Sequence, residues 1–157
     1  MSKGIVLAEV GHIVNLVPPI DITGGVFGDV FHMGKYAHAT IIVQIGVSAA
    51  AFTKIIVNEC TDFAAAGATA IAHTIYKEET DAGDTLGART AVAAAGTTPS
   101  ANNNIMYVIE IDAAQLSAGY GYVQLSLTNG ANSVIASAVA ILSGLRYAED
   151  QSATAIA

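Results

Sequence analysis

Two neighbouring segments near the C-terminus constrain the fold more than any other feature. "YVQLSLT" (122–128) alternates apolar with polar side chains, and "SVIASAVAILSG" (133–144) has no charged residue and no proline. A period of two is the pattern of a half-buried β-strand. The intervening "NGAN" begins with Asn-Gly, which is typical of hairpin turns because both residues accept positive φ. The sequence therefore predicts that 133–144 is a strand paired antiparallel with 122–128.

The two faces of this second strand differ in side-chain size. The larger side chains are predicted to fill the core: Ile135, Val139 and Ile141. The small ones are predicted to pack closely against a neighbouring subunit: Ala136, Ala138 and Ala140. A buried helix is the main alternative, because alanine favours helices, but the β-branched residues favour a strand. A membrane span would need about 20 residues, more than this stretch offers.

Further strand patterns occur along the chain between turn signals. "HIVNLV" (12–17) is predicted to end at Pro18-Pro19, and "IMYVIEID" (105–112) has the clearest alternation. Asp112 is placed to cap a short helical turn near 112–117. Because no regular series of long helices alternates with the strands, we expect an all-β fold: an antiparallel β-sandwich, jelly-roll-like, of about eight strands. Residues 1–157 form one predicted domain, with the N-terminal (1–18) and C-terminal (147–157) segments as candidate interaction arms.

The composition favours a protein that assembles with other subunits. Hydrophobic residues make up 53% of the chain and charged residues 12%, against a usual charged share of roughly 25%. An apolar surface of this kind favours packing against another subunit, although a monomer with an alanine-rich surface is the alternative. The net charge of −7 argues against binding to nucleic acid phosphates. The single cysteine, Cys60, excludes an intrachain disulfide framework and fits a protein made in a reducing cytoplasm.

Residues whose side chains could act in catalysis or bind a metal form no recognisable pattern. The histidines His12, His32, His38 and His73 lack the spacing of a helical zinc site. The acidic segment "EETDAGD" (78–84) lacks the ligand spacing of an EF-hand and is interpreted as an exposed turn. We therefore expect no catalytic residues, no cofactor, no metal ligands and no enzyme activity. Tyr120 and Tyr122, in "GYGY", are predicted at the rim of a subunit interface.

Several segments together resemble a known group of viral proteins. "MGKYAHATIIVQIG", "NIMYVIEIDAAQL" and "GYGYVQLSLTNGANSVIASAVAILSGLRYA", in this order, are similar to small virion proteins of tailed bacteriophages, and the likeness runs from about Asn15 to the end. The resemblance implies a β-rich, non-enzymatic, multimeric capsid decoration (cement) protein. Its implied partners are the major capsid protein and itself, as a homotrimer. From the charge and the length of the apolar stretch, we expect no nucleic acid and no membrane among its partners. Its implied location is the capsid surface of the virion, after synthesis in the host cytoplasm. No functional residues accompany the resemblance.

Two other functions remain open at this point. A tail- or fibre-associated β-sandwich that binds host carbohydrate or a receptor would use Tyr120, Tyr122 and the acidic turn as its site. A small hydrolase or lyase on a jelly roll would need His32, His38 and His73 to converge with a carboxylate around a metal ion. For the decoration protein, we expect a homotrimer whose subunits meet partly through the Ala136, Ala138 and Ala140 face.

Overall fold

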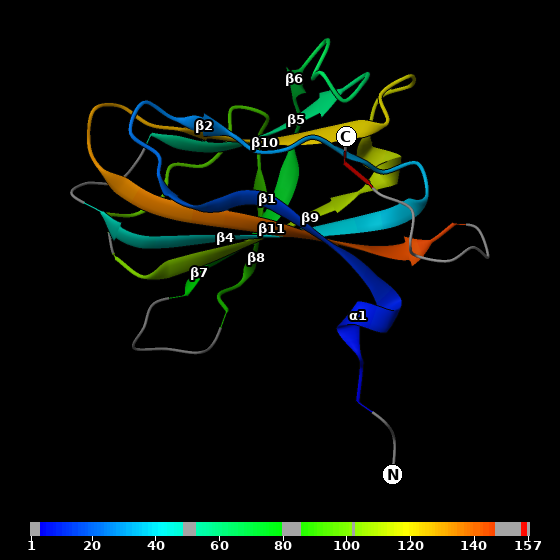
Figure 1. Cartoon of the computed structure of the whole chain (residues 1–157), viewed down its shortest axis with the longest axis horizontal. Helices are drawn as coiled ribbons and strands as arrows, with labels where there is room; N and C mark the ends of the chain where they lie inside the picture. Colours follow the sequence, from blue (N-terminus) through cyan, green and yellow to red (C-terminus); the bar gives the residue numbers. More distant parts are fainter. Residues whose placement is uncertain (1–3, 49–52, 80–85, 102, 147–154, 157) are drawn as a thin grey trace.

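Two antiparallel β-sheets pack face to face in the computed structural model, which describes residues 4–48, 53–79, 86–101, 103–146 and 155–156 (Figure 1). The six-stranded sheet has the order β1 (Gly11–Asp21), β11 (Val134–Leu145), β4 (Tyr36–Ser48), β9 (Ile105–Asp112), β7 (His73–Glu79) and β8 (Arg89–Val92). The five-stranded sheet has the order β2 (Val26–Phe27), β10 (Tyr122–Thr128), β5 (Lys54–Cys60) and β6 (Thr69–Ala70), and β3 (Phe31–His32) also pairs with β10.

The predicted all-β sandwich is confirmed, and eight of the described strands have four or more residues. The predicted helical turn is also present as the 3-10 helix η1 (Ala113–Gln115), which directly follows β9. The Gln115 side-chain oxygen accepts the Asp112 backbone N–H at 2.7 Å and so fixes this turn. A four-residue helix, α1 (Leu7–Val10), precedes β1 and was not predicted. None of the described helices is long and apolar enough to cross a membrane.

The core lies between the sheets and follows the alternation of the strands. In β9 the side chains of Ile105, Tyr107, Ile109 and Ile111 are buried, as the sequence pattern predicts. From the five-stranded sheet, Val57, Val123, Leu125 and Leu127 are buried against them. Each strand therefore contributes every second residue to one apolar layer, which is the arrangement of two sheets packed face to face.

The predicted hairpin between 122–128 and 133–144 is wrong, because the two strands lie in different sheets. β10 pairs with β5, whereas β11 pairs with β1 and β4. Neither Asn129 nor Gly130 has the positive φ of a tight hairpin turn. Instead the Asn129 amide donates to the Ile22 carbonyl at 3.1 Å, and Gly130 accepts the Gly24 N–H at 2.8 Å. These bonds hold the connection as a corner between the two sheets.

The segment 133–144 is a strand as expected, but its predicted orientation is wrong. The side chains of Ala136, Ala138 and Ala140 are buried inside the sandwich, with at most 1% of their surface exposed. The larger side chains of Ile135, Val139 and Ile141 lie on the outer face of the six-stranded sheet. A strand in this orientation offers no contact to a second subunit through its alanines. The homotrimer itself stays a prediction.

The reason for this orientation is the size of the side chains on the neighbouring strands. Ala140 lies between Ile41 of β4 and Val14 of β1, and Ala138 lies beside Val43 of β4. These three neighbouring residues are all buried. Close packing requires large and small side chains to alternate across a layer. The alanines therefore fill the space that their larger neighbours leave, and the core needs no bulkier residue there.

The predicted N-terminal arm (1–18) divides into two parts. Residues 11–18 belong to β1, which continues through Pro18 and Pro19 instead of ending before them. Proline cannot donate a backbone hydrogen bond, but β1 is an edge strand, where that loss is tolerated. Residues 4–10, with α1, project from the body of the molecule (Figure 1). Only this part has the form of an arm.

The described part of the C-terminal segment lies against its own domain. Ala155 is buried, and its carbonyl accepts the His32 backbone N–H at 2.9 Å. Ile156 packs against the core. Residues 147–154 and 157, which belong to the predicted C-terminal arm, lie outside the described residues. The end of the chain thus completes the sandwich beside β3, whereas the described N-terminal residues extend away from it (Figure 1).

Candidate interaction surface

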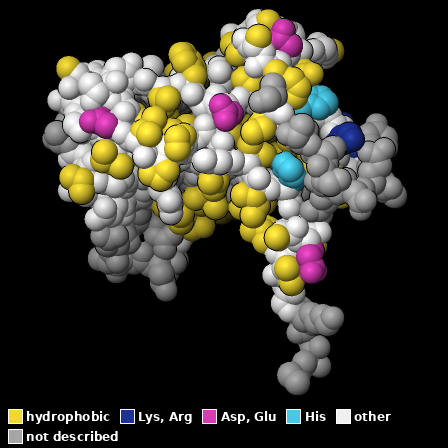
Figure 2. All heavy atoms as spheres, viewed as in Figure 1, with side chains coloured by type: hydrophobic (Ala, Val, Ile, Leu, Met, Phe, Trp, Pro, Cys, Tyr) yellow, Lys and Arg dark blue, Asp and Glu magenta, His cyan; other side chains and the backbone are white. Residues whose placement is uncertain are grey.

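The outer face of the six-stranded sheet carries a band of apolar side chains, here called the outer stripe. It consists of Ile13, Ile42, Tyr76, Val108, Val139 and Ile141. Strand register sets these residues side by side: Ile13 opposes Ile141, Val139 opposes Ile42, and Val108 joins Ile42 to Tyr76. Ile13 is 52% exposed. Figure 2 shows hydrophobic side chains gathered on the visible face around β1 and β11.

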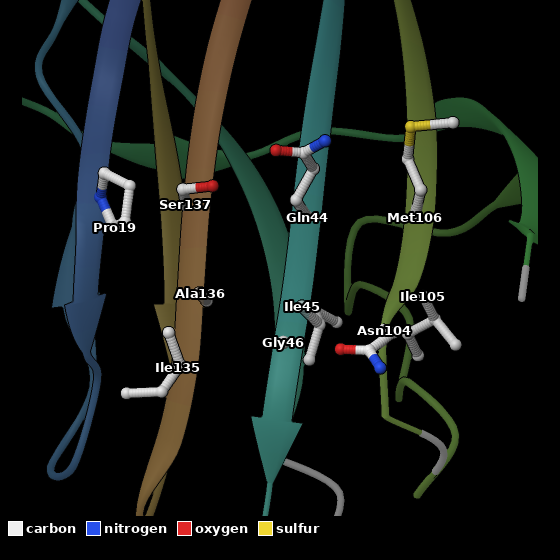
Figure 3. Close-up of a pocket in the computed structure, with 10 residues that line it drawn as sticks. All are labelled: Pro19, Gln44, Ile45, Gly46, Asn104, Ile105, Met106, Ile135, Ala136 and Ser137. Carbon is white, nitrogen blue, oxygen red and sulfur yellow. The ribbon is translucent and has the colours of Figure 1, made fainter. Parts of the chain in front are cut away.

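A shallow depression lies beside the outer stripe, where β1 and β9 flank β11 and β4 (Figure 3). Its volume is about 380 Å³. The lining residues on the outer face are Pro19, Gln44, Gly46, Met106, Ile135 and Ser137. Gly46 contributes no side chain, and a Cβ built there would lie 3.6 Å from the Ile135 Cβ, an ordinary contact distance. The missing side chain therefore leaves a hollow that is apolar or neutral and carries no charged residue among these six.

A polar group marks another part of the same face. His38 of β4 lies between Glu110 and Asp112 of β9, with its Nε2 2.6 Å from Glu110 Oε2 and its Nδ1 2.7 Å from Asp112 Oδ1. Thr40 Oγ1 donates to the same Glu110 oxygen at 2.7 Å. Register makes this contact possible, because His38 opposes Asp112 and Thr40 opposes Glu110. The carboxylates are acceptors, so both ring nitrogens act as donors when His38 is protonated.

The charge of His38 depends on this arrangement. Partial burial alone would lower the pKa of His38, but the hydrogen bonds to Asp112 and Glu110, together with their negative charges, raise the pKa above its ordinary value. The three groups form a mixed hydrogen-bond and ion-pair network on the sheet surface. The imidazole is hydrogen-bonded to both carboxylates, and these contacts place no nucleophile beside it. We interpret the network as a structural link between β4 and β9.

The predicted interface residues do not share one surface. Tyr122 starts β10 in the five-stranded sheet, where its ring lies 4.5 Å from the His32 ring and 4.8 Å from the Phe63 ring, measured between centroids. Tyr120 lies two residues before the start of this strand and is half-buried. The alanines of β11 are inside the other sheet. Tyr122 thus belongs to a small aromatic group with His32 and Phe63, of which Phe63 is 37% exposed.

The histidines named as candidate metal ligands lie on separate elements. His32 stacks on Tyr122, His38 binds two carboxylates, and His73 is buried at the start of β7. The His73 Nδ1 lies 3.1 Å from the Ile71 carbonyl, and burial lowers the pKa of His73. Among the described residues, no group of three or more His, Cys, Asp or Glu side chains is arranged to hold a metal ion. The side chains of the acidic segment 78–84 lie outside the described residues.

Sequence reasoning missed both the outer stripe and the His38 network. A local signal for the network exists, because Glu110 and Asp112 are two residues apart in one strand, as are His38 and Thr40, so each pair shares a face. What joins the pairs is the register of β4 on β9, which links residues more than 70 positions apart. The stripe depends in the same way on the pairing of five strands. A single strand cannot reveal such neighbours.

Comparison with known proteins gives one structural likeness. No protein-family model and no curated protein sequence matches the chain. Among solved structures, the chain is similar to the crystal structure of the SPBc2 prophage-derived protein YomS, with 17% sequence identity and a TM-score of 0.45. The similar region covers 89% of this chain and 99% of the other.

Proposed function

We propose that the chain is a non-enzymatic structural protein of a tailed-bacteriophage particle, and specifically a capsid decoration protein that binds the assembled shell as a multimer. The observation that carries the proposal is the outer stripe with its neighbouring depression: Ile13 is 52% exposed, four further stripe residues are partly exposed, and only Val108 of the six is buried. The resemblance of several segments to small phage virion proteins supports the particle as its setting. The major capsid protein and further copies of this chain are its proposed partners.

The outer stripe is typical of a surface that neighbouring subunits cover in an assembly. Soluble monomers rarely expose a contiguous apolar patch larger than a few hundred Å² unless it binds something. Here the apolar side chains cross the sheet from β1 to β7, and Ile13 and Ile135 are 52% and 40% exposed. Only 12% of the chain is charged, so little charge is available to keep such a face in water. Assembly would cover it.

A decoration protein stabilises a shell by binding one of its states. Copies that bind the assembled shell, but not the separated subunits, shift the equilibrium towards the assembled state by mass action. At a free concentration one hundred times the dissociation constant, each bound site gains about 2.7 kcal/mol. Many modest contacts, each made by a small apolar face, therefore suffice to reinforce a large shell.

The proposal is tested on purified particles. Particles with the protein and particles stripped of it are heated, and release of DNA is followed by a fluorescent dye. We expect stripped particles to release DNA at a lower temperature, and adding the protein back to restore the original temperature. Equal release temperatures would contradict the decoration role. Mass spectrometry of whole particles gives the location, because hundreds of copies per particle indicate the capsid and a handful indicate the tail.

The aromatic group favours one alternative function. His32, Phe63 and Tyr122 form a cluster of tilted and edge-on rings at one end of the five-stranded sheet, and Phe63 is partly exposed. Aromatic faces of this kind bind sugar rings in carbohydrate-binding proteins. The alternative is therefore a tail- or fibre-associated protein that binds host carbohydrate or a receptor. Glycan-array binding that is lost in Phe63→Ala, and kept in the control Phe27→Ala, would favour it.

A further inference from the structure

The N-terminal segment Gly4–Val10 exposes apolar side chains without a partner surface on its own domain. Ile5 is 85% exposed, and Val6, Leu7 and Val10 are 42–52% exposed. Its helix α1 has four residues, none of them buried, and no side-chain cap. An isolated helix of one turn is unstable in water without tertiary contacts. Binding to another surface would bury these apolar side chains and stabilise the helix.

We propose that this segment binds the depression, beside the outer stripe, of a second copy of the chain, so that copies are linked by exchange of their N-terminal segments. The two surfaces have matching chemistry. Between Gly4 and Val10 the only charged side chain is Glu9, and the outward residues of the depression, including Gln44, Met106 and Ser137, are uncharged. A short apolar segment fits a neutral hollow of about 380 Å³ beside an apolar stripe.

Chain geometry excludes the depression of the same copy. Ile5, the apolar residue of the segment furthest from β1, lies six residues before Gly11, so it reaches at most about 21 Å from the start of the strand. The depression begins at Pro19, eight residues further along β1, which is about 26 Å away. The segment also projects away from the body (Figure 1). Its apolar residues can therefore occupy the depression only on another copy.

The contact joins two different surfaces, a segment on one copy and a sheet face on the next. Such a heterologous contact closes into a ring when the rotation between copies allows it. The expected homotrimer is one such ring, and a reciprocal exchange between two copies is another closed arrangement. The contact forms between copies in solution and does not depend on where the particle binds them. A failed exchange would therefore leave the decoration role intact.

Cross-linking between two variants, each carrying one added cysteine, tests the contact directly. The natural Cys60 is buried, so it does not compete. Leu7→Cys and Ser137→Cys proteins are mixed and treated with a short bifunctional maleimide. We expect a covalent dimer containing one chain of each kind. Gln124→Cys, on the outer face of the five-stranded sheet, replaces Ser137→Cys as the control and should give no such dimer. No dimer, or equal yields with both partners, would overturn the proposal.

Sedimentation of the full chain provides the second measurement. Leu7→Asp in the segment and Gly46→Val in the depression are each expected to weaken self-association about tenfold or more, which corresponds to about 1.4 kcal/mol. The control Phe27→Asp changes a residue that is 68% exposed on β2 and should leave association unchanged. Thermal melting confirms that each variant folds. A monomeric full chain at all concentrations would overturn the inference, as would association that Leu7→Asp leaves unchanged.

Discussion

His38 illustrates how one side chain on a sheet surface becomes sensitive to pH. Because its two carboxylate partners raise the pKa of His38, the folded state binds the proton more tightly than the unfolded chain. The resulting stabilisation is fully present below the unfolded value of about 6.5. It is lost as the pH rises through the raised pKa of the folded protein. The network therefore strengthens the link between β4 and β9 in mildly acidic solution.

Replacing one carboxylate should shift this titration. In Glu110→Gln the negative charge beside Nε2 is removed, while an amide of similar size remains near Thr40 and His38. We expect the pKa of His38 to fall, so that its stabilising effect is lost at a lower pH than in the natural protein. The ring proton shifts of His38, followed by NMR from pH 5 to 9, measure this directly. An unchanged or higher pKa would show that Glu110 does not hold the proton on His38.

Asp21 stabilises the corner between the sheets, and its pKa is lowered where that of His38 is raised. Hydrogen bonds from Ser133 and Thr23 lower the pKa of Asp21 to about 2, and the Ser133 hydroxyl donates to Asp21 Oδ2 at 2.6 Å. The stabilisation from this carboxylate is present above the unfolded pKa of about 3.9 and is lost as the pH falls through 2. We expect Asp21→Asn to lower the melting temperature at pH 6 and to reduce its decline between pH 4 and 2. If the melting temperature of Asp21→Asn declined between pH 4 and 2 as much as that of the natural protein, other groups would cause the acid sensitivity.

At the scale of the element, β11 shows what an alternating pattern can and cannot predict. The period of two in 133–144 correctly separates Ala136, Ala138 and Ala140 from Ile135 and Val139. It does not say which face is inside, because both faces are apolar. The outcome depends on the space left by side chains of β1 and β4, such as Val14 and Ile41. Those residues lie about 90 or more positions away in the sequence, so local hydrophobicity carries no information about them.

A pair of leucine substitutions tests this orientation. Ala138→Leu adds volume beside Val43 in a filled layer, and overpacking of this kind costs roughly 1–3 kcal/mol of the free energy of unfolding. Val139→Leu lies on the outer face and should change the free energy of unfolding by less than about 0.5 kcal/mol. Urea denaturation of both variants measures the difference. A larger cost for Val139→Leu would mean that β11 has the opposite face inward.

At the scale of the whole molecule, the fold follows from pairings that adjacent strands do not reveal. Strand positions and the sandwich architecture could be predicted, because alternation and turn residues are local. The assignment of β10 and β11 to different sheets could not, because Asn129-Gly130 is a local hairpin signal that here occurs at a corner between the sheets. Their hydrogen bonds with Ile22 and Gly24 hold this connection as a corner between the sheets. The candidate surface has the same origin, since five strands from distant parts of the chain build it.

Truncation of the two ends of the chain should therefore affect the melting temperature differently. Removing residues 1–10 deletes no buried side chain of α1, so we expect the melting temperature to change by less than about 2 °C at concentrations where the chain is monomeric. Removing residues 147–157 exposes the site that Ala155 fills and leaves the His32 N–H without its 2.9 Å acceptor. That loss should cost about 1–2 kcal/mol, or about 2–8 °C in melting temperature.

Calorimetry of both truncated chains measures these changes, and sedimentation shows whether self-association follows the first truncation alone. The expected pattern is a stable but monomeric chain without residues 1–10, and a less stable chain that still associates without residues 147–157. The reason is that the N-terminal residues make their contacts on another copy, whereas Ala155 makes its contacts within its own domain. A C-terminal truncation that melts with the full chain would show that the packing of Ala155 against β3 contributes nothing to the stability of the sandwich.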